Sequence, residues 1–298
     1  MINGILNVYK EVGFTSHDVV AKLRGIVKQK KIGHTGTLDP DATGVLPVCL
    51  GNATKLCDML TDKNKEYVAS FRLGFCTDTQ DISGKVLKTS EKAVTEEVVK
   101  EAILAFVGEY DQIPPMYSAL KVNGKKLYEL AREGIEIERK ARRVAILGIE
   151  ILNMNMPDIK IKVQCSKGTY IRTLCHDIGL KLGTYATMTS LERTRVSNFS
   201  VENALTLSQI ETYVKEDKVS EILVKTEDAF ENMLSVRVAP PFEKLLMNGN
   251  PIYLNQIVEK IRIGNKEQVK VYAKDKFCAV YECDENRNIL KPVKMFLE

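Results

Sequence analysis

An aspartate stands inside a stretch that is rich in glycine, proline and threonine, residues 31–47. Such a composition cannot form an uninterrupted helix, so we expect a shaped loop there. Within it, Asp39 precedes Pro40, which favours an extended backbone at Asp39 and fixes the next φ angle. A carboxylate on a stiff backbone can attack or bind at a fixed point, although an isolated Asp-Pro pair is more often an ordinary turn.

The residues around Asp39 form a long and specific pattern. From residue 33 to residue 47 they read Gly-His-Thr-Gly-Thr-Leu-Asp-Pro-Asp-Ala-Thr-Gly-Val-Leu-Pro. This stretch closely resembles the catalytic signature of the TruB family of tRNA pseudouridine synthases. The resemblance implies an enzyme that isomerises a uridine in RNA, with Asp39 as the catalytic residue.

A tyrosine opens the next strand that the sequence predicts. Residues 66–74 alternate as in a half-buried strand, and Tyr67 on its own would be an aromatic residue of the core. In the family, the tyrosine at this place stacks on the target base. The resemblance therefore implies that Tyr67 stacks on the uracil and can take part in proton transfer.

A third segment supplies a partner for the aspartate. Residues 159–165 alternate as a strand, and the sequence Gly-Thr-Tyr-Ile-Arg that follows is again similar to the family. Arg172 would keep Asp39 ionised and hold it in a fixed bidentate geometry. Tyr170 and Arg172 are two residues apart on what we expect to be an extended segment, so they should share a face. In isolation the pair would be a surface arginine beside a packed tyrosine.

The resemblance extends to residues 187–199 and implies the walls of a pocket for a flipped base. Leu191 matches the leucine that lines the uridine pocket, and Tyr170 would form another wall. A lone histidine is usually structural, but the place of His34 in the motif favours filling the space of the flipped base or contacting RNA beside it. The chain departs from the family pattern at Glu192 and Ser197, which concerns peripheral RNA contacts more than the chemistry.

Residues 112–143 resemble a mobile segment that grips RNA in the family. Residues 121–143 hold eight bases and four acids, with Tyr128 among them. Bases mixed with an aromatic ring suit phosphate contact and base stacking. A short amphipathic helix with a solvated basic face, ending at Gly134, would explain the same pattern.

The remaining patterns predict an α+β protein. A strand at residues 5–10 precedes a helix with Ser16 as its N-cap. A second helix begins at Thr95, and another helix ends before Gly183. A helical, acidic segment runs from Leu207 to Met233. The resemblance implies the pseudouridine synthase fold, with a mixed, mainly antiparallel central sheet flanked by helices.

Two domains are expected, a catalytic domain at residues 1–233 and a small one at residues 234–298. Turn signals and short strands in the second indicate a β-rich domain, which resembles the PUA-type RNA-binding domain that follows the catalytic domain in the family. Positive charge lies in residues 1–200 and 236–298, on either side of an acidic stretch. This distribution suits phosphate contacts by two regions, although the net charge of +4 also fits an ordinary surface.

The bulk composition excludes several classes. A hydrophobic content of 44% without a long apolar run fits a globular protein with no membrane span. The scattered cysteines indicate reduced thiols, so we expect the protein in the cytoplasm. The seven cysteines include no Cys-x-x-Cys pair, and the acids of residues 76–84 lack the spacing of a calcium loop, so we expect no metal. Phosphate-loop and dinucleotide fingerprints are also missing, which agrees with chemistry that needs no cofactor.

Family resemblance further implies that the substrate is the uridine at position 55 in the T loop of tRNA. One alternative is a homologue that depends on a guide RNA, but the chain begins close to its first motif, which favours a stand-alone enzyme. We also expect a monomer. Another alternative is an RNA-binding protein without chemistry. The presence of Asp39, Tyr67 and Arg172 together argues against it.

Overall fold

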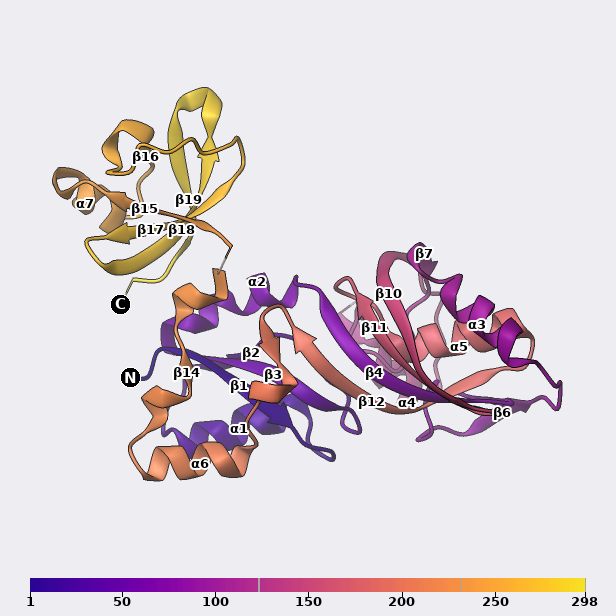
Figure 1. The fold of residues 1–298 in the computed structure, drawn as a ribbon. Helices are drawn as coiled ribbons and strands as arrows, with labels where there is room; N and C mark the ends of the chain where they lie inside the picture. Colours follow the sequence, from indigo (N-terminus) through magenta and orange to yellow (C-terminus); the bar gives the residue numbers. More distant parts are fainter. Residues whose placement is uncertain (123, 231, 298) are drawn as a thin grey trace.

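The computed structural model describes residues 1–122, 124–230 and 232–297. The strands of a ten-stranded sheet lie between residues 4 and 224. Their order is β14-β1-β3-β12-β4-β11-β10-β7, with β2 beside β3 and β13 beside β12 (Figure 1). Its strands are β1 (Gly4–Lys10), β2 (Ile32–His34), β3 (Thr43–Leu50), β4 (Lys65–Leu73), β7 (Gly108–Gln112), β10 (Arg142–Asn155), β11 (Asp158–Cys165), β12 (Ala186–Val196), β13 (Phe199–Ser200) and β14 (Leu223–Val224). Within this sheet only β3 and β12 pair in parallel, which confirms the mixed, mainly antiparallel sheet of an α+β fold.

Helices cover the two halves of this sheet. The helices before residue 216 are α1 (Ser16–Ile26), α2 (Cys57–Thr61), α3 (Glu96–Leu104), α4 (Leu127–Arg132), α5 (Ile171–Leu182) and α6 (Leu207–Lys215), whereas α7 (Glu243–Met247) packs in the C-terminal part. Helices α1 and α6 bury their apolar residues with β1 and β3, whereas α3 and α5 do so with β4, β10 and β11. Two small hairpins, β5 (Phe75–Thr77) with β6 (Val86–Thr89) and β8 (Lys121–Val122) with β9 (Lys125–Lys126), stand outside the large sheet.

The N-cap of α1 lies one residue earlier than the sequence indicated. Thr15, and not Ser16, is the N-cap, because its hydroxyl accepts from the N–H of Asp18 while the Asp18 carboxylate accepts from the N–H of Thr15. Ser16 is instead buried as the first helical residue. This leaves the Ser16 hydroxyl free to bind the loop that contains Asp39.

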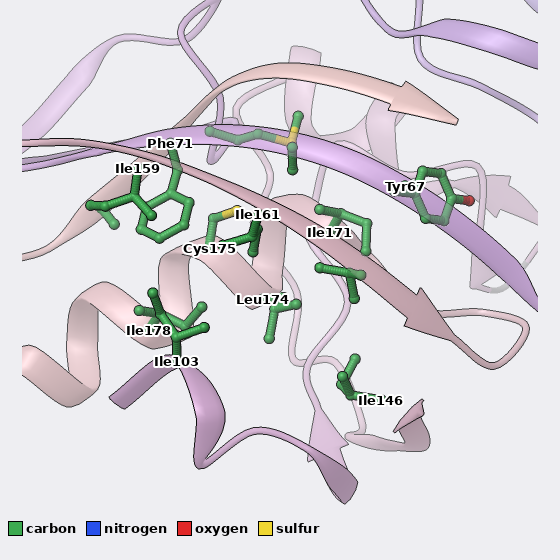
Figure 2. Close-up of a cluster of buried hydrophobic side chains, with 14 of the residues drawn as sticks. Tyr67, Phe71, Ile103, Ile146, Ile159, Ile161, Ile171, Leu174, Cys175 and Ile178 are labelled. Atoms are coloured by element: carbon green, nitrogen blue, oxygen red, sulfur yellow. The ribbon is translucent and has the colours of Figure 1, made fainter. Parts of the chain in front are cut away.

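The alternation of β11 is visible in its burial. Ile159, Ile161, Val163 and Cys165 are buried, and they pack with α5 in one cluster (Figure 2). Strand β11 lies next to β4, so the same cluster takes in Tyr67 at one end of β4. Figure 2 shows the Tyr67 ring at the margin of this cluster, with its oxygen turned away from the apolar side chains.

A separate five-stranded sheet forms the β-rich C-terminal part. It has the order β15-β17-β18-β19-β16, with β15 (Leu234–Val238), β16 (Ile252–Tyr253), β17 (Gln268–Ala273), β18 (Lys276–Asp284) and β19 (Ile289–Met295). Its rings Phe277 and Phe296 stack with centroids 5.2 Å apart and form one buried cluster with Leu56 and Leu60 of the first part. The long helical segment expected up to Met233 was wrong: α6 ends at Lys215, and short 3₁₀ turns and β14 follow.

Candidate active site

The loop between β2 and β3 holds Asp39, and the N-terminal strand and helix fix its backbone. Ser16 Oγ accepts a hydrogen bond of 2.9 Å from the N–H of Leu38, whose side chain is buried. Lys10 Nζ reaches the other side of the aspartate and donates a hydrogen bond of 2.9 Å to the carbonyl of Pro40. The backbone is therefore anchored on both sides of Asp39, which stiffens the position of its carboxylate.

Arg172 is the ion-pair partner of Asp39. Its Nε lies 3.0 Å from Asp39 Oδ2, and its Nη1 lies 3.6 Å from Asp81 Oδ2. The guanidinium also donates to the carbonyls of Thr79 and Tyr117, at 3.0 and 2.8 Å. With 5% of its side chain exposed and these contacts made, Arg172 has little freedom to move away from the carboxylate.

The expected extended segment is found at Tyr170 but was wrong for Arg172. Helix α5 begins at Ile171, so Arg172 is its second residue and Tyr170 precedes the helix. The side chain of Gln112 accepts a hydrogen bond of 2.8 Å from the N–H of Tyr170, which holds that residue extended just before the helix starts. Arg172 thus points toward Asp39 from the first turn of a helix and not from a strand.

The Asp39 carboxyl is partly accessible, with 42% of the side chain exposed. The surrounding protein still displaces much of its water, and this desolvation raises the pKa of Asp39 above its usual value. Arg172 and Lys10 oppose the shift, whereas the nearby Asp81 adds to it. The site therefore combines a guanidinium that favours the carboxylate with an environment that makes it more basic than an exposed aspartate.

Tyr67 and Leu191 come from neighbouring antiparallel strands, β4 and β12. Tyr67 is buried, and Arg193 lies directly opposite it in the strand register. Leu191 is opposite Ala69 and packs against the cluster that contains Tyr67. Burial raises the pKa of the Tyr67 hydroxyl, which remains protonated near neutral pH.

Tyr170 directly precedes α5, and His34 ends β2 just before the loop. Tyr170 is half-buried, and the Asp39 carboxylate is one of the charges that act on its hydroxyl. His34, in β2, has its ring edge-to-face with that of His17, with centroids 5.4 Å apart. Burial lowers the pKa of His34 and favours its neutral form. The structure thus brings Tyr67, Tyr170 and Arg172 around Asp39, and it places His34 beside the start of the same loop.

Two buried bases at this site were missed from the sequence. Lys10 and Arg193 expose 0% and 1% of their surface, although both residue types usually lie at the surface. A signal was present, since Lys10 continues the alternation of Leu6 and Val8, and Arg193 follows Leu191 by two residues. Burial lowers the pKa of Lys10 to about 8.

Across residues 1–122, 124–230 and 232–297, no group of three or more His, Cys, Asp or Glu side chains could hold a metal ion. No helix in those ranges is both long enough and apolar enough to cross a membrane.

Comparisons with known proteins identify the fold. Residues 24–171 match the model of the N-terminal domain of TruB family pseudouridylate synthases, and residues 172–235 match that of the tRNA pseudouridylate synthase B C-terminal domain. A solved structure described as a Cbf5-Nop10-Gar1 complex is similar over 99% of this chain and 85% of its own, with a TM-score of 0.77 and 28% identity. An H/ACA RNP bound to a substrate RNA containing 2′-deoxyuridine gives a TM-score of 0.76, with 26% identity over 99% of this chain and 85% of its own. The fold is thus that of an RNA pseudouridine synthase.

Curated relatives identify the family of pseudouridine synthases to which the chain belongs. The tRNA pseudouridine synthase B of Lachnoclostridium phytofermentans is 52% identical over 99% of this chain and 100% of its own length. The protein of the same name from Alkaliphilus oremlandii is 44% identical over 100% of this chain and 99% of its own. The chain belongs to the TruB family of pseudouridine synthases.

Proposed function

We propose that this protein isomerises uridine 55 in the T loop of tRNA to pseudouridine, without a cofactor and with Asp39 as the catalytic aspartate. The observation that carries the proposal is the 3.0 Å ion pair between Arg172 and Asp39, within a loop that is hydrogen-bonded on both sides of the aspartate. The relatives named tRNA pseudouridine synthase B support tRNA as the substrate.

The reaction breaks the bond between ribose C1′ and uracil N1 and forms one between C1′ and C5. One proton leaves C5 and one is gained at N1, so no net electrons are transferred. Asp39 acts at the sugar or at the base as nucleophile or charge stabiliser, or it permits loss of a sugar proton, and these routes remain alternatives. Arg172 keeps the carboxylate ionised and oriented in each of them.

The target base must leave its stack to reach the carboxylate. We assign Tyr67 to stacking on the uracil and to proton transfer, and Tyr170 and Leu191 to the pocket walls. His34 would occupy the space that the base leaves or contact the RNA beside it. The location of Tyr67 and Leu191 on adjacent strands, and of Tyr170 before α5, supports a pocket with walls on fixed elements.

Two regions are proposed to hold the RNA. One is the insertion at residues 112–143, where Lys121 and Lys125 are exposed on a hairpin and the Tyr128 ring lies under Lys126 and Arg132. Arg172 binds the Tyr117 carbonyl, so this insertion is tied to the catalytic ion pair. The other is the PUA-like domain at residues 234–298, which follows the catalytic domain at residues 1–233. We expect a cytoplasmic monomer that uses no guide RNA.

The test is a tritium-release assay. An unmodified tRNA transcript carrying tritium at uridine C5 is incubated with the protein alone, with no cofactor and no guide RNA. Release of one tritium per tRNA, mapped to the T loop, is expected. Binding of tRNA without release would overturn the proposal, and restoration of release by an added guide RNA would then identify the guide-dependent alternative.

A further inference from the structure

A second arginine, Arg193, lies buried against the loop that carries Asp39. Arg193 Nε donates a hydrogen bond of 2.7 Å to the carbonyl of Val45, and Nη2 donates one of 3.2 Å to the carbonyl of Gly36. Gly36 precedes Asp39 in the chain and Val45 follows it, so Arg193 binds the backbone on both sides of this aspartate. No carboxylate of the described residues lies within ion-pair distance of Arg193, so its charge is balanced by dipoles.

The backbone of Arg193 is fixed as tightly as its side chain. It pairs with Tyr67 on β4 and with Gly44 on β3, so the residue lies between the tyrosine strand and the strand after the loop. A Cβ atom at Gly44 would approach the Arg193 carbonyl oxygen to 2.2 Å, so a side chain there would force the two strands apart. The guanidinium therefore has a defined place relative to both Tyr67 and the loop.

Arg193 and Tyr67 are both buried and lie directly opposite each other on β12 and β4, so the guanidinium charge acts on the Tyr67 hydroxyl. A guanidinium is positively charged and carries only N–H donors, so the tyrosine oxygen turns its lone pairs, and not its proton, toward it. A phenol has a single proton, which must then point away from Arg193. Burial keeps that proton on the oxygen near neutral pH, since it raises the pKa of Tyr67.

We propose that Arg193 is a positioning residue for the isomerisation: its positive charge turns the lone pairs of the Tyr67 oxygen toward the guanidinium, so that Tyr67 presents its O–H proton to the flipped uracil. This inference rests on the proposed function, because it assigns a geometry to a base bound beside Asp39. The two carbonyl contacts fix the guanidinium, and the strand register fixes the tyrosine opposite it. Arg193 touches neither the sugar nor the base in this scheme.

A double-mutant cycle separates this role from support of the loop. The variants are Arg193→Lys, Tyr67→Phe and the two combined, and the readouts are the single-turnover rate on tritiated tRNA, the Kd for tRNA and the melting temperature. A positioned proton donor contributes about 10²-fold, so Tyr67→Phe should slow the reaction by about that factor, and Arg193→Lys by about 10-fold. Because Arg193 acts through the hydroxyl, Arg193→Lys should change the rate less than 3-fold or so when Phe is already present.

Arg72→Met is the matched control, since Arg72 lies on the same strand as Tyr67 but is exposed and pairs with Asp158. Its rate should equal that of the wild type. Equal slowing by Arg193→Lys in the Tyr and Phe backgrounds would show a purely structural role and overturn the inference. If Arg193→Lys fails to fold, a full rate for Tyr67→Phe would overturn it as well, because the hydroxyl would then do nothing. An inactive wild type would instead refute the proposed function.

Discussion

Two buried arginines stand on different sides of the same loop, and they are neutralised in different ways. Arg172 comes from the first turn of α5 and faces two carboxylates, those of Asp39 and Asp81. Arg193 comes from β12, donates to two backbone carbonyls and lies opposite Tyr67 in the strand register. The first side pairs a cation with the carboxylate that we propose as catalytic, whereas the second side places a cation without a carboxylate partner opposite Tyr67.

The two guanidinium groups therefore have different effects on the charged groups around them. A guanidinium beside carboxylates holds them ionised and in place, as expected for Arg172. A guanidinium without a carboxylate makes its surroundings positive, and Arg193 is one of the charges that lower the pKa of Lys10, after desolvation. Lys65 follows the same rule, with desolvation and then Arg193 lowering its pKa to about 8. The β12 side of the pocket is thus cation-rich, which favours an anionic substrate such as RNA.

The largest effect that we expect on this comparison comes from Asp39→Asn. This change removes the reactive charge from the Arg172 side and leaves the Arg193 side untouched. We expect the single-turnover rate to fall about 10⁴-fold or more, with the Kd for tRNA little changed. Tritium release and filter binding measure the two quantities. Unchanged turnover would refute the assignment of Asp39.

Arg172→Met should have the next largest effect. It leaves Asp39 and Asp81 without their common cation, and the Thr79 and Tyr117 carbonyls without a donor. We expect a rate loss of about 10²-fold, since the carboxylate is no longer positioned, and a loss of about 1–3 kcal/mol in the free energy of unfolding. Urea denaturation and single-turnover kinetics measure both.

Arg72→Met serves again as the control for Arg172→Met, because its ion pair with Asp158 is half exposed. A stability loss of similar size in the two variants would contradict the comparison. It would mean that the contacts of Arg172 contribute no more than a surface ion pair does.

Gly44→Ala tests the Arg193 side of the loop, because Gly44 pairs with the backbone of Arg193. Gly44 has a φ of +102°, and a Cβ atom would clash with the Arg193 carbonyl. We expect a loss of about 2–4 kcal/mol in the free energy of unfolding from strain and overpacking together, with a slower reaction. Gly134→Ala isolates the strain, since Gly134 has a φ of +74° and no atom within 4 Å of the added Cβ, and it should cost about 1 kcal/mol. Equal losses would show that the close approach of β3 and β12 is unimportant.

Much of the fold could be predicted from local patterns. The period of two marked β4 and β11, and Gly183 marked the end of α5, where it adopts a positive φ. The helical pattern after Leu207 was overextended, because acidic, partly apolar turns share the composition of a helix. The pairing of β12 with both β3 and β4 joins segments far apart in the chain, and no local pattern carries that information.

The candidate site shows the same limit. Asp39 stood out because glycine and proline around it demand a special loop, and Arg172 was named through a resemblance whose residue roles stay predictions. Lys10 and Arg193 were missed because long basic side chains usually lie at the surface, and their burial depends on carbonyls that the fold brings to them. Local propensity cannot reveal a hydrogen-bond acceptor that comes from another strand.

The smallest effect that we expect is a shift in the pH dependence of the rate, and it concerns only the Arg172 side of the comparison. Desolvation raises the pKa of Asp39, so on acidification the carboxylate is protonated, and the rate lost, at a higher pH than for an exposed aspartate. A raised folded-state pKa also means that the stability contribution of this group is present below its unfolded pKa and is lost as pH rises through the folded one. Asp81→Asn removes a neighbouring negative charge, so the acid limb of the single-turnover pH profile should move to lower pH. Asp158→Asn, at an exposed ion pair, should leave the limb in place; an equal shift in both variants, or none in Asp81→Asn, would contradict the coupling of Asp81 to Asp39.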